Sequence, residues 1–341
     1  MTPIVDCVLN RTPDTFTAYF DYDNPLSFRS IALGSRNDVV STDPLADFVQ
    51  PNEFRAARQN AFMADFPSAG SISWSLEGLT VKADRNSPQC SGRELSTVAF
   101  APQTALFGAE SVTLGDHVLV RSSSEFASVL SGGEVSVGGD TAVGHVFAGA
   151  RAVLAAHAEV RGTLVTAQAV EALGNASVKG QEREHAVVPS HSIAWWVNFG
   201  SAHSGTTLAP NETRTLAPGA YGDVVVPSGA VLTLKPGRYQ FASLSVASAG
   251  ALSAAGGDVI VHVASSLQHH GQTRIASDAS LMLGYLGTDS AAIDGSFRGT
   301  VVAPNAAVVL GAVRNSVYTG AFFARALEVR PSSIVEYAAQ R

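Results

Sequence analysis

Between residues 112 and 180 the chain repeats one short pattern four times, and this repeat limits its possible folds more than any other feature. The copies begin at Val112, Val135, Val153 and Val170, so that their starts lie 23, 18 and 17 residues apart. Each copy is a short apolar strand followed by a turn of small residues. Such a period is typical of a β-solenoid, whose coils bury their inward faces only by stacking. We therefore expect a scaffold, on which any functional site needs a separate argument.

A second region of the chain, from residue 221 onward, has the same character with longer coils. Turns at Pro227-Ser228-Gly229 and Ala303-Pro304-Asn305 separate its strands. No amphipathic helix of ten residues lies between strands, which excludes a parallel sheet with crossover helices. We predict strands at residues 223–226, 231–234, 238–241, 244–246, 259–263, 281–285, 299–302, 308–310, 321–323 and 327–329.

Residues 1–90 have a different pattern, typical of a small β-sandwich. Thr15–Tyr22 alternates, which places Phe16, Ala18, Phe20 and Tyr22 on one face. Turns about every ten residues separate further strand candidates. These candidates are residues 30–33, 61–66, 71–76 and 79–83, with one short helix at 53–60.

The expected fold is therefore all-β, with a β-sandwich over residues 1–90 and a right-handed parallel β-helix over residues 91–341. Residues 91–110 are interpreted as a linker and a first cap. A polar and aromatic insertion at about 182–220 interrupts the β-helix.

Composition excludes several classes of function. Apolar residues make up 46% of the chain and charged residues 15%, which suits a continuous core and not disorder. The net charge is −7 and no basic run is present, so nucleic acid and anionic membrane surfaces are not expected partners. No apolar run approaches the roughly 20 residues of a membrane-spanning helix.

The two cysteines, Cys7 and Cys90, bracket the first domain. Metal or redox chemistry would need a closer companion, such as a second cysteine three residues away, and neither cysteine has one. We therefore expect a disulfide that closes this domain and stabilises it by roughly 4–5 kcal/mol in the chain-entropy model. Such a bond indicates an oxidising compartment. We expect an extracellular or cell-surface protein whose signal peptide is missing from this sequence.

Three segments also resemble parts of a known family. They are the segment from Thr213 to Ala230, the segment from Gly299 to Gly311 and the segment from Tyr318 to Val329. They resemble segments of exported bacterial polymer-forming, bactofilin-like β-helix surface proteins. The stretch from Cys7 to Cys90 is similar to the N-terminal sandwich domain often joined to such helices. The resemblance implies the fold and an exported location, and it implies no catalytic residues.

Catalytic residues are not evident elsewhere in the chain either. Polysaccharide lyases and hydrolases need paired carboxylates or an acidic calcium cluster beside a base. The carboxylates after residue 90 are scattered, and the nearest to a pair are Asp289 and Asp294. No Ser-His-Asp arrangement and no phosphate-binding glycine loop is apparent. We therefore expect no enzyme activity and no cofactor.

Two sets of histidines are weak candidates for a metal site. Aligning the repeats places His117, Asp140 and His157 at one position in consecutive coils, about 4.8 Å apart, and such a ladder can bind a transition metal. The alternative is three polar residues at an exposed corner. His269 and His270 form an isolated pair at an expected turn.

Trp195 and Trp196 are the candidates for a carbohydrate contact. If residues 193–199 form a strand, their side chains point to opposite faces, and an exposed one can stack on a sugar ring. The alternative is that both pack as a lid or a domain contact.

These observations predict a non-enzymatic structural or adhesive protein of the bacterial cell surface or extracellular matrix. We expect its partners to be its own copies, as an oligomer or filament joined at the C-terminal coil, and surface polysaccharide. The alternative is a carbohydrate-active enzyme or carbohydrate-binding protein on a β-helix scaffold.

Overall fold

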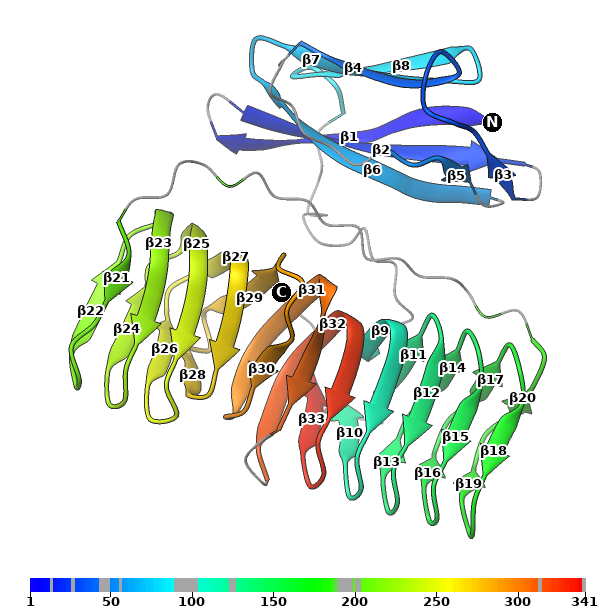
Figure 1. Cartoon of the computed structure of the whole chain (residues 1–341), viewed down its shortest axis with the longest axis vertical. Coiled ribbons are helices and arrows are strands. Elements are labelled where there is room, and N and C mark those ends of the chain that lie inside the picture. The colour runs from blue at the N-terminus through cyan, green and yellow to red at the C-terminus, as the bar shows by residue number, and fades with distance from the viewer. Residues whose placement is uncertain are drawn as a thin grey trace. The chain divides into compact units, whose positions relative to one another are not determined.

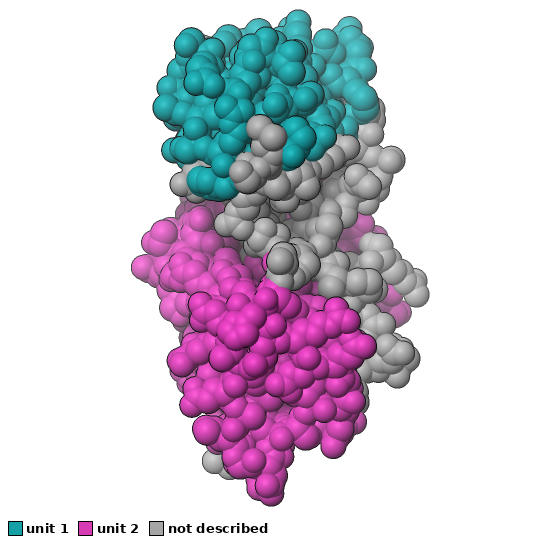
Figure 2. All heavy atoms as spheres, turned by 90° about the vertical axis from the view of Figure 1, so that its right-hand side faces the viewer, with its two compact units in different colours: residues 1–99, 194–198 teal, residues 100–193, 199–341 magenta. Residues whose placement is uncertain are grey.

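The computed structural model describes the chain from Met1 to Ala338 with gaps at residues 13–14, 26–27, 43–49, 55–56, 89–103, 123–126, 187, 189–198, 200–203 and 312–314. Within these bounds every regular element is a β-strand, and the described residues contain no helix able to cross a membrane. The chain divides into two compact units, coloured separately in Figure 2 and treated separately below. The all-β fold is confirmed.

The N-terminal unit consists of small antiparallel sheets. One sheet has the order β1-β2-β6 and another the order β4-β7-β8, and β3 pairs with β5. The strands are β1 (Thr2–Thr12), β2 (Thr15–Asn24), β3 (Arg29–Ser30), β4 (Asn37–Ser41), β5 (Glu53–Phe54), β6 (Ala57–Pro67), β7 (Ser71–Leu76) and β8 (Leu79–Asp84).

An aromatic cluster joins the two three-stranded sheets. Phe20 of β2 and Phe62 of β6 stack with ring centroids 4.8 Å apart, and both meet the Trp74 ring of β7 edge-on. Trp74 is fully buried, and its indole N–H donates to the side-chain oxygen of Asn37 over 3.0 Å. The buried indole thus has its hydrogen-bond partner, as a packed aromatic core requires. The predicted alternation in β2 is confirmed.

The helix predicted at residues 53–60 is wrong. The structure places Glu53–Phe54 in β5 and the stretch from Ala57 in β6. Phe54 is fully buried against Tyr22 and Trp74. Packing of this aromatic side chain between the sheets overrides the weak helical propensity of the polar residues that follow it.

The second unit is a β-solenoid, as predicted, with its strands in three rows that we call walls A, B and C (Figure 1). Wall A contains β11 (Ser128–Ser131), β14 (Val146–Ala148), β17 (Leu164–Thr166), β20 (Glu182–Arg183) and β29 (Ser280–Tyr285). Wall B contains β12 (Glu134–Val137), β15 (Ala152–Leu154), β18 (Val170–Ala172), β21 (Thr206–Thr207) and β30 (Ala291–Ile293).

Several long strands bend from one wall into the next. They are β9 (Thr104–Leu114), β23 (Gly219–Val226), β25 (Gly237–Val246), β27 (Asp258–His269), β31 (Phe297–Leu310) and β32 (Val317–Val329). Wall C contains β10 (Leu119–Ser122), β13 (Ala142–Val143), β16 (Glu159–Val160), β19 (Ser177–Val178), β22 (Thr213–Leu216), β24 (Val231–Leu234), β26 (Ala251–Ala254), β28 (Gln272–Ile275) and β33 (Ile334–Tyr337). All strands predicted after residue 221 lie within these elements.

The coils stack in parallel register, which corrects the predicted alignment by one residue. Val135 pairs with Val112 on one side and with Ala152, not Val153, on the other. Consequently Ala152 and Leu154 point into the core, whereas Val153 points outward between Ser136 and Glu171. The sequence alone left open which of Val153 and Leu154 points inward, and the two-residue period of the paired strands assigns that position to Leu154.

The coils are not stacked in the order of the chain. β32 pairs with β31 on one side and with β9 on the other, and β33 pairs with both β32 and β10. The chain therefore enters the stack in its middle and winds outward to β20. It resumes at the opposite end with β21 and β22 and winds back until the last coil meets the first (Figure 1).

We call the junction of β32 and β33 with β9 and β10 the seam, and it is bonded as continuously as any other coil contact. Gly115 N–H donates to Val329 O over 2.7 Å and Leu119 N–H to Ser333 O over 3.1 Å. Two ion pairs cross it, Arg325 with Glu110 and Arg121 with Glu336, each joining residues 215 positions apart. The predicted open edge at the C-terminal coil is therefore wrong. Of the linker and first cap predicted at residues 91–110, residues 91–103 lie outside the described residues, whereas residues 104–110 belong to β9 inside the stack and form no cap.

Near the seam, from β29 through β31, β32 and β9 to β11, wall A is buried on both of its sides. Its inward row includes Val301, Phe322 and Leu106, which belong to the solenoid core. The neighbouring row points outward, yet Val302 is only 6% and Phe107 0% exposed. Strands with both faces buried have continuous apolar sequences and do not alternate between apolar and polar residues.

The register predicts different costs for the same change at adjacent positions. Leu154→Asn places an amide without a partner in the core and should lower the free energy of unfolding by about 3 kcal/mol. Val153→Asn leaves its amide in water and should cost under about 1 kcal/mol. Urea unfolding of both variants measures the difference, and equal costs would contradict the register.

The seam predicts that the C-terminal strand is needed for stability. Deleting residues 332–341 removes β33 with the fully buried Val335, so that β10 and the start of β32 lose the strand with which they both pair at the seam. We expect a loss of at least about 3 kcal/mol in chemical unfolding. Deleting only residues 339–341 is the control and should leave stability unchanged. If deleting residues 332–341 left the free energy of unfolding unchanged, the result would contradict the seam and indicate that the C-terminal coil is an end of the stack.

Candidate functional site

The corner between walls B and C collects the polar residues that the repeat suggested as metal ligands. Backbone bonds run from His117 N–H to Gly139 O and from Asp140 N–H to Ala156 O, so that His117, Asp140 and His157 occupy equivalent turns as predicted. All three have positive φ, of 58°, 52° and 62°. Asn315 and Ser332 continue this row across the seam with φ of 61° and 62°.

The backbone conformation explains why these positions are polar. Left-handed φ disfavours most side chains, and Asn, Asp and His are enriched there several-fold. The side chains themselves are exposed, and the His117 Nδ1 to Asp140 Oδ2 distance is 3.9 Å. Within the described part of the chain, no group of three His, Cys, Asp or Glu side chains could hold a metal ion. The backbone conformation of these turns thus explains the row of polar residues, and no observation in the described residues supports metal binding there.

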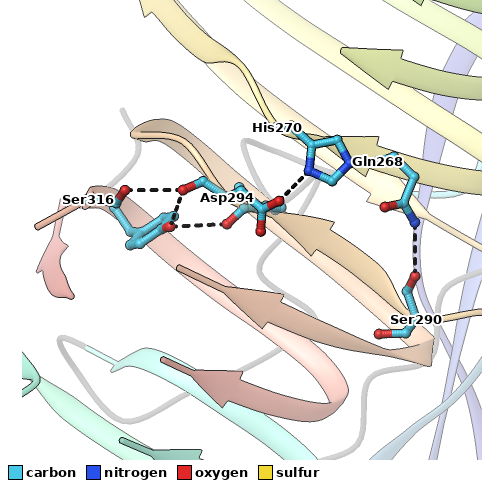
Figure 3. Close-up of polar contacts among 7 residues, drawn as sticks. Gln268, His270, Ser290, Asp294 and Ser316 are labelled. Carbon is cyan, nitrogen blue, oxygen red and sulfur yellow. Dashed lines mark hydrogen bonds and ion pairs between the residues drawn. The ribbon is translucent and has the colours of Figure 1, made fainter. Parts of the chain in front are cut away.

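The other histidine pair lies at the same corner on the other side of the seam, and Figure 3 shows its surroundings. His270 Nδ1 contacts the carboxylate of Asp294, which lies one coil further along. The main-chain oxygen of Asp294 accepts hydrogen bonds from the Ser316 and Tyr318 hydroxyls, each over 3.1 Å. Burial raises the pKa of Tyr318 to about 12, so that its hydroxyl remains a donor at neutral pH.

A histidine–carboxylate pair can serve as a general base, provided that a hydroxyl or thiol lies within reach of the ring. Among the described residues no hydroxyl bonds to His270, and the nearby Ser316 bonds to a main-chain oxygen instead. The contact is therefore a link between two coils. Sequence reasoning missed it because His270 and Asp294 are 24 residues apart, a coil offset that only the register reveals.

His269 is a core residue without a hydrogen-bond partner. Its side chain lies in the inward row of wall B between Val246 and Ile293, and both ring nitrogens are buried and unbonded. The ring packs edge-on against Phe297 at 5.5 Å. Burial lowers the pKa of His269 to about 4, because the apolar row disfavours the charged ring. A position normally taken by Val or Ile thus carries a titratable group.

The remaining predicted site residues lie partly outside the described residues. Cys7 is buried in β1 and is not a free thiol, and Val8 N–H donates to Pro88 O over 2.8 Å. Cys90 is outside the described residues, so its bond to Cys7 stays a prediction. Trp195 and Trp196 are also outside them. Asp289 and Asp294 belong to different settings, because Asp289 lies near Tyr285 and Asp294 at the His270 corner.

A hollow that the sequence did not indicate lies at the corner between walls C and A. It has a volume of about 300 Å³ and is lined by residues of successive coils, with Asp258, Asp278 and Arg298 among them. These residues are 20 positions apart in the chain, and no local motif marks them.

Comparison of this chain with protein-family models, with curated proteins and with solved structures finds no match to any of them.

The buried His269 predicts a pH-dependent stability. Its pKa is about 4 in the folded protein and about 6.5 when unfolded, so that between these values the unfolded chain binds more protons. Stability should therefore fall as the pH falls from about 6.5 to 4, by up to about 3 kcal/mol. His269→Leu should remove this slope and stabilise the protein at pH 5, whereas the exposed-site control His157→Asn should not. Unfolding curves at several pH values measure this, and an unchanged slope in His269→Leu would refute the assignment.

Proposed function

We propose that this chain is a non-enzymatic structural or adhesive protein of the bacterial cell surface or extracellular matrix, and that it associates with its own copies end to end. One observation carries the proposal: the parallel ladder has a single direction along the whole stack and ends in strands that pair with described strands on one side only. The bactofilin-like resemblance of its sequence is consistent with this role.

The end at β21 and β22 offers an open edge. Carbonyl groups of Glu212 and Leu216 accept bonds from β24, so the strand's alternation turns the peptide groups of Thr213 and Thr215 away from the stack. Among the described strands none pairs with β22 on that side. Exposed N–H and C=O groups in such a row template a further strand.

The opposite end, formed by β18, β19 and β20, is open in part. Each of these strands pairs with one described neighbour only. The carboxylate of Glu184 folds back and accepts the outward Val170 N–H over 2.5 Å, which blunts this edge. Because both ends share one strand direction, β21 and β22 of one copy can continue the rows of β18 and β19 of another in parallel register. An end-to-end contact of this kind does not close and gives a filament.

Two single substitutions test this contact in opposite directions. Thr215→Pro removes an outward N–H without breaking a bond to β24, and should shift the protein toward monomer. Glu184→Ala frees Val170 N–H and should strengthen association. Light scattering and negative-stain microscopy over a wide concentration range measure both.

Thr215→Val is the matched control, because it keeps the N–H and the branched side chain, and it should associate like the parent chain. A parent chain that stays monomeric at every concentration would contradict end-to-end association. So would association that is equal in all variants.

The second candidate is a carbohydrate-binding role. The observation that favours it is the polar hollow at the corner between walls C and A.

A further inference from the structure

The hollow lies on the long side of the solenoid, away from both ends. Its lining combines charged and hydroxyl side chains with Ala279 and with the edges of Ile275 and Leu281, which belong to the core. Its volume of about 300 Å³ lies at the lower end of the range for small-ligand sites.

A change in coil perimeter produces this hollow. Between β28 and β29 the corner is a turn, closed by the Ala279 N–H to Ala276 O bond, and it projects outward. In the next coils the corner is a single glycine within β31 or β32. Gly299 and Gly320 have φ of 148° and 143°, and a Cβ on Gly320 would lie 1.9 Å from Gly299 O. Only glycine fits there, and the missing side chains leave space beside the projecting turn.

The rim carries charges that the protein does not use internally. Asp258 accepts a hydrogen bond from Ser280 over 2.6 Å, which fixes one carboxylate. Neither Asp278 nor the guanidinium of Arg298 has an ion pair among the described residues. The main chain of Arg298 is held by its N–H bond to Thr273 Oγ1, and its side chain is exposed at the rim. Charged groups of both signs therefore face the hollow without partners across it.

The numbers of negative and positive side chains around the hollow favour a neutral ligand with hydroxyl groups. Two carboxylates against one guanidinium make the hollow unfavourable for phosphate or another anion. A metal ion is not favoured, because no group of three potential ligands occurs in the described chain. A hydroxyl group can donate to a carboxylate and accept from a guanidinium at once. The stacked coils place these groups at steps of about 4.8 Å, each offering a contact to a ligand with several hydroxyls.

We infer that this hollow binds one residue of a saccharide, with its hydroxyl groups bonded to Asp258, Asp278 and Arg298. The inference rests on the second function proposed above. It is independent of end-to-end association, since none of these residues lies in β18 to β22.

Titration of the full chain with a panel of neutral hexoses, N-acetylhexosamines and their disaccharides tests this inference by calorimetry and by NMR of the sugar. We expect at least one sugar to bind, and Arg298→Ala and Asp278→Asn each to weaken binding about tenfold through loss of a charged hydrogen bond. Arg274→Ala removes an exposed arginine of wall C that does not line the hollow, and should bind like the parent.

The inference is overturned if no sugar of the panel binds, or if Arg274→Ala weakens binding as much as Arg298→Ala. It is also overturned if inorganic phosphate or Ca²⁺ binds at the hollow and sugar does not. Light scattering on the same samples separates this result from that of self-association, because Arg298→Ala should leave the association state unchanged.

Discussion

The parallel pairing of β32 and β33 with β9 and β10 is the contact on which the rest of the solenoid depends. It joins two arms of the stack that the chain winds separately, and without it each arm would end in an exposed core. The inward rows run through it without interruption, from Leu310 through Val329 to Leu114. Chain entry and exit therefore lie in mid-stack, and between β20 and β21 the chain must pass from one extremity to the other. This explains why 22 residues separate the wall A strand β20 from the wall B strand β21, whereas three residues separate β17 from β18.

Two kinds of corner govern the surface. Between walls B and C the turns need left-handed residues, which Asn, Asp, Ser and His supply at the positions of Asn315, Ser332, His117 and Asp140. Between walls C and A the glycines Gly299 and Gly320 allow an abrupt corner with no room for a side chain. The first kind yields a polar row that resembles a ligand ladder and has a conformational origin. The second yields a hollow where unpaired charges meet, although no sequence motif marks it.

The proposed roles use separate parts of this architecture. Self-association would use the strand ends at β22 and at β18 to β20, whereas saccharide binding would use the flank at Asp278 and Arg298. A solenoid suits this separation, because each coil contacts only its neighbours and a change at one level leaves distant levels intact. His269, unbonded in an aliphatic row, is the exception, since its protonation would weaken the stack from inside.

The sequence by itself determined the element types, with the exception of residues 53–60, where a helix was expected and packing between the sheets makes strands. Apolar alternation in Thr15–Tyr22 and the repeats at Val112 to Val170 gave strands and a stack, because burial of one face follows a two-residue period. It also aligned His117, Asp140 and His157. Only the tertiary structure decided the order of coils, because parallel pairing does not depend on how far apart two strands are in the sequence. Leu114, for example, pairs with Val137 on one side and with Val329 on the other. The contact of His270 with Asp294 and the hollow at Arg298 follow from that stacking, since their residues meet only when the coils are in register.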